Sequence, residues 1–315
     1  MMTSSERKDV VIVGGGPAGL NAALVLGRAR KEVLLCDGGV RRNIMAEGIH
    51  GFLTRDGTPP DEFRRIAREQ LRPYGVEVRD TRVTSVERTA SGFRVALEGG
   101  REVVSRRVLL AMGLVDEVPD LPGYRELWGK SIFQCPYCHG WEVRDRAFGV
   151  LATSAPLLDF ALFLTGWSRD VVAFTDGAWE VPAEQRQRLE RAGVRLEHRR
   201  VRQLISRTGH EPHGDHLEAV ELEDGTRVAR EVLFARPLQR QTELVLRLGV
   251  ALDEKGFVRV DAHQETSIPG IHAAGDLTTP LQAATVAAAA GFQAAAMMNH
   301  ALNLENADSG VHPRG

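Results

Sequence analysis

Residues 9–19 read D-V-V-I-V-G-G-G-P-A-G, and this stretch decides the fold. The apolar, β-branched run 9–13 suits a buried parallel strand. A G-x-G-x-x-G over 14–19 follows, then an alanine- and leucine-rich helix to about Arg28, and a second strand, 33–35, that ends at Cys36-Asp37. Glycines let the backbone approach a pyrophosphate, a helix N-terminus favours its charge, and an acid about 20 positions onward binds a ribose hydroxyl. This order of elements predicts a dinucleotide site, with Cys36 a buried strand-end residue.

A second strand–helix–strand layout occupies residues 148–174, but its turn carries no glycine. The turn reads A-T-S-A-P over 152–156, and each side chain would hold a pyrophosphate away from the backbone. The second strand ends at Thr175-Asp176, where a carboxylate would repel a 2′-phosphate and no arginine adjoins it. The sequence therefore predicts that this second nucleotide site is disabled.

Two of the three cysteines lie three positions apart in S-I-F-Q-C-P-Y-C-H-G-W-E, residues 131–142. Cysteines at this spacing can close a small disulfide ring, and either thiol can become the attacking thiolate. Pro136 favours a helix start, which would place Cys135 near a helix N-terminus, where positive charge stabilises a thiolate. We interpret Cys135 and Cys138 as a redox dithiol, and His139 as a proton carrier because imidazole titrates near neutral pH. A plain hydrogen-bonding role is the alternative for His139.

Three other interpretations of the cysteine pair compete. C-x-x-C-H is also a c-type haem attachment string, but residues 1–13 contain no long apolar region or cleavage site of an exported protein. A zinc knuckle needs four ligands, and the chain has no second cysteine pair. Two buried structural thiols are the third. The H-x-x-H-x-x-H of residues 210–216 invites a metal site, yet Pro212 and Gly214 favour a hairpin loop, so we expect no metal.

The whole chain has 315 residues, a formal net charge of −2 and 43% hydrophobic residues, enough for two domains. Scattered basic residues give no indication of a nucleic-acid partner. No apolar run approaches the ~20 residues that span a membrane. Three cysteines without a signal peptide predict a cytoplasmic protein.

Two further segments contribute to the predicted cofactor site. Residues 267–276 read S-I-P-G-I-H-A-A-G-D and precede an alanine-rich helix from about Leu281 to Asn299, whose N-terminus could face a flavin. An ordinary strand-turn-helix is the alternative. The irregular stretch 41–64 ends at a helix that Asp61 could cap, running to about Leu71. Its residues Arg42, Asn43, His50 and Gly51 could contact the cofactor, although a solvated loop is an equal alternative.

These motifs together resemble the low-molecular-weight thioredoxin reductases over nearly the whole chain. The resemblance implies an α/β protein with two Rossmann-like, three-layer ββα domains that binds FAD and forms a homodimer. The FAD domain would be discontinuous, at 1–117 and 238–315, with a smaller inserted domain at 118–237 that carries the dithiol and a degraded nucleotide motif. Cys138 would lie nearest the flavin and Cys135 would exchange with substrate. By position, the resemblance implies that Gly14, Gly16, Gly19 and Asp37 hold the ADP part of FAD, and that Asp276 and the start of the final helix hold its ribityl and flavin part. The full set of predicted cofactor-binding residues is Gly14, Gly16, Pro17, Ala18, Gly19, Asp37, Arg42, Asn43, His50, Ala111, Gly113, Gly275, Asp276, Gln282 and Ala283.

The chain departs from these reductases at the glycine-free turn and at His139, where they carry an acid. Both departures resemble the dithiol oxidases of the gliotoxin and holomycin type, which have C-x-x-C-H and need no nicotinamide. This resemblance implies an enzyme that oxidises a dithiol, passes the electrons to FAD and then to oxygen, and releases peroxide. One alternative is a reductase of a disulfide substrate, fed by NAD(P)H or by a protein donor such as ferredoxin. The other is a flavin-binding redox sensor without enzymatic activity.

Overall fold

The computed structural model describes residues 6–207 and 216–310, and these residues divide into two compact units. Unit 1 comprises the described parts of Met1–Ile44, Gly51–Val115 and Gln239–Gly315; unit 2 comprises those of Met45–His50 and Asp116–Leu238. Strands β7 (Val115–Glu117) and β16 (Leu238–Arg240) pair as a two-stranded ribbon where the chain passes from one unit to the other.

Unit 1 is built on a seven-stranded sheet. Its parallel strands are β1 (Glu6–Val13), β2 (Val33–Cys36), β3 (Glu77–Arg79), β6 (Glu102–Leu110) and β17 (Ile271–Ala273). An antiparallel extension follows in β4 (Val83–Thr89) and β5 (Gly92–Leu97), which pairs with β6. The apolar run predicted at residues 9–13 is the buried end of β1, between β2 and β6.

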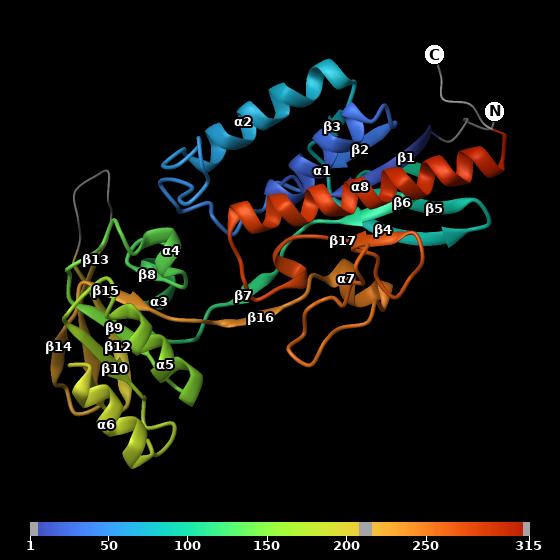
Figure 1. Cartoon of the computed structure of the whole chain (residues 1–315). Coiled ribbons are helices and arrows are strands. Elements are labelled where there is room, and N and C mark those ends of the chain that lie inside the picture. The colour runs from blue at the N-terminus through green and yellow to red at the C-terminus, as the bar shows by residue number, and fades with distance from the viewer. Residues whose placement is uncertain (1–5, 208–215, 311–315) are drawn as a thin grey trace. The chain divides into compact units, whose positions relative to one another are not determined.

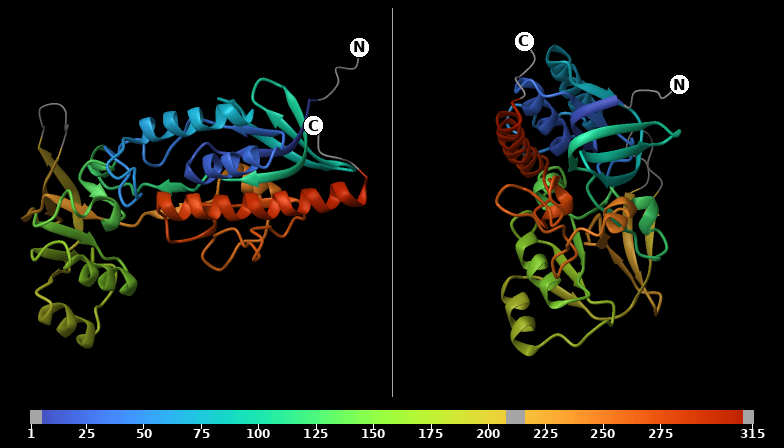
Figure 2. Two further views of the ribbon diagram at one scale, coloured as in Figure 1. Left: turned by 45° about the horizontal axis from the view of Figure 1, so that its top comes forward. Right: turned by 90° about the vertical axis from the view of Figure 1, so that its right-hand side faces the viewer.

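Helices cover one face of this sheet. They are α1 (Pro17–Arg28), α2 (Pro60–Leu71, extended by η1, Arg72–Tyr74) and α8 (Ala284–Asp308), all labelled in Figure 1. Figure 2 shows from two sides that α1 and α8 run side by side. A Cβ at Gly291 would overlap the backbone of Ala18, 2.9 Å from its Cα, so small residues are what allow this close approach. A second core lies between the parallel strands and the layer formed by β4, β5 and α7 (Glu243–Leu248).

Unit 2 repeats the arrangement with a five-stranded parallel sheet in the order β11-β10-β9-β15-β8. The strands are β8 (Ile132–Phe133), β9 (Phe148–Leu151), β10 (Val171–Phe174), β11 (Arg195–Glu197) and β15 (Val232–Phe234). Helices α5 (Ala155–Leu164) and α6 (Ala183–Arg191) pack on one face. The other face packs against α3 (Tyr124–Leu127) and an antiparallel sheet of β12 (Val201–Arg207), β13 (His216–Leu222) and β14 (Arg227–Ala229).

The predicted fold class, α/β with two Rossmann-like ββα units, is confirmed, but two local expectations are wrong. Pro59, not Asp61, is the N-cap of α2, and Asp61 instead pairs with Arg41. Pro60 is the first residue of α2, and its ring fixes φ near the helical value, so the helix starts there without a capping side chain. Helix α8 begins at Ala284 rather than near Leu281.

Residues 210–215, which hold most of the H-x-x-H-x-x-H string, lie outside the described residues. Within the described ranges, no group of three or more His, Cys, Asp or Glu side chains is arranged to hold a metal ion. In the same ranges, no helix combines the length and apolar character needed to cross a membrane.

Candidate functional site

The two cysteines of the C-x-x-C motif form a disulfide at the start of a short helix. Helix α4 spans Pro136–His139, with Cys135 as its extended N-cap and a Cα–Cα distance of 5.3 Å between Cys135 and Cys138. Gly140 ends the turn, and its amide donates to the Pro136 carbonyl at 2.6 Å. A Cβ at Gly140 would lie 2.8 Å from the Trp167 ring, so the glycine keeps the turn tight. The predicted helical turn after Cys135 is therefore present.

His139 is held as a neutral base beside this disulfide. Its ring stacks on Phe133, with 4.3 Å between centroids, and its buried Nδ1 has no hydrogen-bond partner among the described residues. Burial lowers the pKa of His139 to about 4, with a smaller contribution from His50, while the Cys135 backbone and Glu47 act in the opposite direction. The imidazole is therefore neutral at physiological pH and accepts a proton less readily than a free imidazole, so it does not titrate near neutral pH as the sequence suggested.

His50 lies in unit 2. It was predicted to contact the cofactor together with Arg42 and Asn43 of the same loop. Residues 45–50 pack with unit 2, and His50 Nε2 lies 3.6 Å from Glu142 Oε1. Glu142 was not among the predicted site residues. Its only sequence signal is its position three residues after His139, which places both on one short turn. His50, His139 and Glu142 thus bring three titratable groups to the dithiol segment.

The turn between β1 and α1 has the shape of a phosphate cradle. Gly14 has φ +117°, and a Cβ there would lie 2.8 Å from the Met112 amide nitrogen and overlap the Ala111 carbonyl. Gly16, the N-cap of α1, is different, because a Cβ there would meet no atom within 4 Å. Among the described residues no side chain caps α1, and Pro17, Ala18 and Gly19 form its first turn. The cradle therefore fits the diphosphate of a dinucleotide such as FAD.

Asp37, at the end of β2, is buried and already paired. Its carboxylate contacts the guanidinium of Arg64 and lies 2.6 Å from Arg68, and it accepts the Gly39 amide at 3.0 Å. The two arginines lie four residues apart on α2 and therefore face the same side. Neither arginine was predicted, because nothing in the local pattern of α2 points to Asp37. They fix the orientation of the carboxylate that was predicted to bind the ribose.

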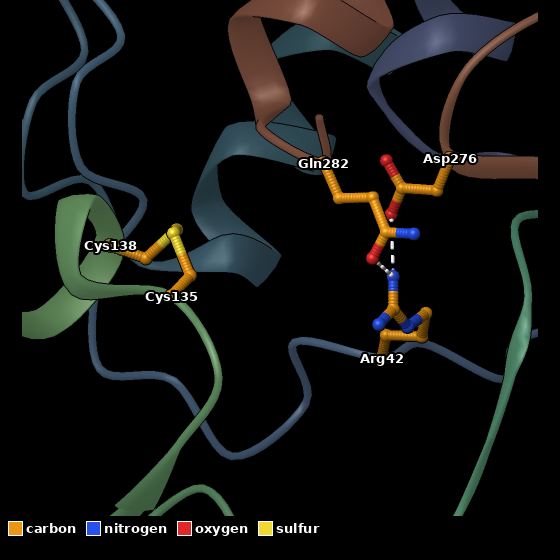
Figure 3. Close-up of a disulfide and its surroundings, with 5 residues drawn as sticks. All are labelled: Arg42, Cys135, Cys138, Asp276 and Gln282. Carbon is orange, nitrogen blue, oxygen red and sulfur yellow. Dashed lines mark hydrogen bonds and ion pairs between the residues drawn. A yellow bond between two sulfur atoms is a disulfide. The ribbon is translucent and has the colours of Figure 1, made fainter. Parts of the chain in front are cut away.

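A second polar group joins the loop after β2 to the residues that precede α8. Arg42 lies 2.9 Å from the Asp276 carboxylate and donates to Gln282 Oε1 at 2.8 Å, as Figure 3 shows. Gln282 in turn exchanges two side-chain hydrogen bonds with Gln239, at 2.8 and 3.0 Å. Three of the predicted cofactor residues, Arg42, Asp276 and Gln282, are thus brought together, and Gln239 joins them.

The remaining predicted residues lie around these groups in unit 1. Ala111 follows β6 and forms the wall beside Gly14, and a Cβ at Gly113 would lie 4.0 Å from Arg42 Cδ. Gly275 has φ +94°, and a Cβ there would lie 3.1 Å from the Cβ of Ala18. Ala283 is the N-cap of α8, which no side chain caps. Asn43 lies in the loop next to Arg42 and carries an exposed side chain.

In unit 2, every residue of the turn after β9, Ala152 to Ser154, carries a side chain. Ala152 is buried, and Trp179 Nε1 donates to its carbonyl at 3.2 Å. The sequence has no arginine next to Asp176, and we expected none near it. This expectation is wrong, because Arg200 and Arg202 line the same cavity as Asp176 in the folded chain. Both arginines come from the segment around the start of β12, which the sequence around residue 176 does not reveal. Asp176 itself accepts the Val201 amide at 2.7 Å.

Comparisons with known proteins agree with this geometry. The family model described as pyridine nucleotide-disulphide oxidoreductase matches residues 8–291. Thioredoxin reductase sirT of Leptosphaeria maculans is 31% identical, with 95% of each chain covered. Thioredoxin reductase tcpT of Claviceps purpurea is 33% identical over 87% of this chain and 88% of its own.

Among solved structures, HlmI is 39% identical with a TM-score of 0.88, covering 96% of this chain and 95% of its own. An oxidoreductase from Agrobacterium tumefaciens is 38% identical with a TM-score of 0.86, covering 95% and 99%. The chain thus belongs to the pyridine nucleotide-disulphide oxidoreductase family, as a thioredoxin reductase-like, FAD-dependent thiol–disulfide oxidoreductase.

Proposed function

We propose that the protein oxidises a dithiol to a disulfide, with oxygen as the final electron acceptor and without a nicotinamide donor. The observation that carries this proposal is the contrast between two equivalent turns in one chain. The β1–α1 turn has Gly14 and, at the N-cap of α1, Gly16, whereas the equivalent positions of the β9–α5 turn are Ala152 and Ser154, the N-cap of α5, and the Trp179 indole donates to the Ala152 carbonyl. A pyrophosphate needs close approach to the backbone, which only the first turn permits.

The dithiol segment provides the groups that such an oxidation requires. A substrate thiolate attacks the Cys135 sulfur, a mixed disulfide forms, and Cys138 leaves as a thiolate. The second substrate thiol then attacks the mixed disulfide, so that the substrate becomes a disulfide and the two cysteines hold its two electrons. His139, neutral through burial, takes the proton from the attacking thiol. When bound, FAD supplies the two-electron acceptor that restores the Cys135–Cys138 disulfide.

The rest of the assignment follows from the same reasoning. The cradle at Gly14–Gly19, with Asp37, would hold the ADP part of FAD, and Asp276 with the start of α8 would hold its ribityl and flavin part. The module at residues 118–237 would be a nicotinamide domain in fold that has lost its nucleotide function. A homodimer and a cytoplasmic location complete the proposal.

Anaerobic mixing of the FAD-loaded enzyme with different electron donors tests the direction of electron flow. We expect a small dithiol to bleach the flavin quickly, and NADPH or NADH to bleach it very slowly. Admission of oxygen should restore the colour and release one peroxide for each dithiol oxidised. The Cys135→Ser variant is the matched control, since it retains the flavin site but cannot exchange with a dithiol. Fast and saturable bleaching by either nicotinamide would contradict the proposal.

One observation favours a reductase as the second candidate. Arg200 and Arg202 line a cavity together with Gly177, close to the end of β10, where an arginine could bind a 2′-phosphate. In this case NADPH would be the donor and a disulfide the substrate. The anaerobic experiment separates the two candidates, because only the reductase shows saturable reduction by NADPH. Multiple turnovers under either condition would exclude a redox sensor without enzymatic activity.

A further inference from the structure

Cys135 and Arg236 occupy equivalent positions at the ends of two neighbouring strands. Strands β8 and β15 are parallel, and Phe133 pairs with Phe234 in their register. The rings of these two residues lie on the same face, with 6.3 Å between centroids, in the core beneath α5. Because side chains alternate along extended chain, the next residues on that face are Cys135 and Arg236.

The backbone beyond each strand supports this placement. Cys135 is extended, with φ −124° and ψ 110°. Arg236 precedes Pro237, which disfavours the helical conformation and keeps the residue before it extended. The hydrogen bond from the Ala235 amide to the Phe133 carbonyl, 2.9 Å, ties the two chains together at this point. The redox cysteine and the guanidinium group therefore leave the same edge of the sheet.

A row of aromatic rings connects the dithiol to Arg236. Tyr137, between the two cysteines, lies 5.7 Å from the Phe163 ring, and Phe163 lies 6.4 Å from Phe160. The Arg236 guanidinium carbon is 4.2 Å from the centre of the Phe160 ring. Tyr137 and Phe163 are 67% and 43% exposed. Tyr137 and Phe163 therefore form an exposed apolar surface next to the reactive sulfurs, and the buried Phe160 ring links this surface to the Arg236 guanidinium.

Arg236 has no carboxylate partner among the residues that the structure describes. Burial alone lowers its pKa, without any contribution from an acid, and the guanidinium remains charged at neutral pH. The acid next to Phe160 on α5 is Asp159, which pairs with Arg188 at 2.7 Å. Arg236 is exposed to solvent, and a cation that stacks on an aromatic ring without a carboxylate partner in the described part of the chain is suited to receive an anionic group.

We propose, on the basis of the dithiol chemistry proposed above, that the substrate is a dithiol with an apolar body and a carboxylate-type anionic group. Arg236 binds the anionic group, while the apolar body lies on Tyr137 and Phe163 and presents its sulfurs to Cys135. Arg236 is thus a specificity-determining residue. It takes no part in the sulfur exchange itself.

Dihydrolipoate and dihydrolipoamide are matched probes, since they share the dithiol and the alkyl chain and differ in the charge at the far end. Anaerobic flavin reduction should show a kcat/KM roughly tenfold or more higher for dihydrolipoate. In Arg236→Gln the value for dihydrolipoate should fall to that for dihydrolipoamide, which should itself be unchanged. Arg144→Gln is the control, because Arg144 is a cation of the same unit that stacks on Trp141, 4.0 Å from its ring centre. It should preserve the preference.

Equal kcat/KM values in the wild type, or a preference that survives in Arg236→Gln, would overturn the assignment of Arg236 while leaving the dithiol oxidase proposal intact. Failure of both probes to reduce the flavin would contradict the proposed function instead. Calorimetric binding of lipoate and lipoamide to the oxidised protein then tests Arg236 without turnover. Tighter binding of lipoate, lost in Arg236→Gln, supports the inference, and equal affinities refute it.

Discussion

Replacing Gly16 by alanine tests the phosphate cradle with one added methyl group. Gly16 has φ −83°, a conformation that alanine adopts without strain, and its Cβ would meet no atom within 4 Å. The protein without cofactor should keep its stability, or gain up to about 1 kcal/mol from the stiffer unfolded chain. With FAD bound, the methyl would occupy the space where a diphosphate approaches the N-terminus of α1. Such overpacking costs about 1–3 kcal/mol, which weakens FAD binding roughly 5- to 150-fold.

The assay is a titration of apoprotein with FAD, followed by quenching of flavin fluorescence, together with thermal unfolding of the apoprotein. Gly14→Ala is the contrasting variant. Its φ of +117° and a Cβ 2.8 Å from the Met112 nitrogen predict a loss of stability even without cofactor. Wild-type FAD affinity in Gly16→Ala, or a drop in its apoprotein stability, would refute the assignment of the open space to the diphosphate.

Three further predictions follow from the described contacts. His139→Gln should lower turnover roughly 10²-fold. Because the folded-state pKa of His139 is about 4, below the ~6.5 of an unfolded chain, wild-type stability should fall as pH drops from about 6.5 to about 4, and the variant should lose this part of the profile. Mixed with a linear low-molecular-weight disulfide, Cys138→Ser should accumulate a mixed disulfide at Cys135, visible by mass spectrometry, because Cys135 attacks the disulfide, one thiol leaves and no second enzyme thiol resolves the adduct; Cys135→Ser should not accumulate it. Arg42→Gln should weaken FAD binding about tenfold in the same titration, because the Asp276 carboxylate loses the cation 2.9 Å away.

Each of these has a result that would contradict it. A stability profile of His139→Gln that still falls between pH 6.5 and 4 by the wild-type amount would show that His139 is not the buried neutral group. Equal trapping at either single cysteine would contradict the order of attack. Unchanged FAD affinity in Arg42→Gln would separate the group of Arg42, Asp276 and Gln282 from the cofactor site.

The fold could be predicted from sequence because its signals are local. The strand–glycine–helix unit of residues 9–28, the strand 148–151 and the strand 171–174 each carry their pattern within a few residues, and the structure places them at these positions. Periodicity and turn residues determine such elements without reference to the rest of the chain.

The pairings that complete the site could not be predicted, because they join residues far apart in sequence. Asp37 pairs with Arg64 and Arg68, 27 and 31 positions away. His50 meets Glu142 across more than ninety positions, and no periodic pattern links them. The same holds for Arg236, whose relation to Cys135 becomes visible only through the register of β8 and β15.

The two units place their functional groups differently on similar sheets. In open α/β sheets, ligands bind beyond the carboxyl ends of the strands, close to the point where the strand order reverses. Unit 1 follows this rule at the β1–α1 turn, where glycine leaves room for a diphosphate. In unit 2 the corresponding turn after β9 has no glycine, and the neighbouring strand ends carry Cys135 after β8 and Arg236 after β15. The carboxyl ends of the strands lie at one edge of each sheet, and the residues at that edge determine which ligand binds there. In unit 2, Cys135 and Arg236 make that edge suitable for thiol chemistry.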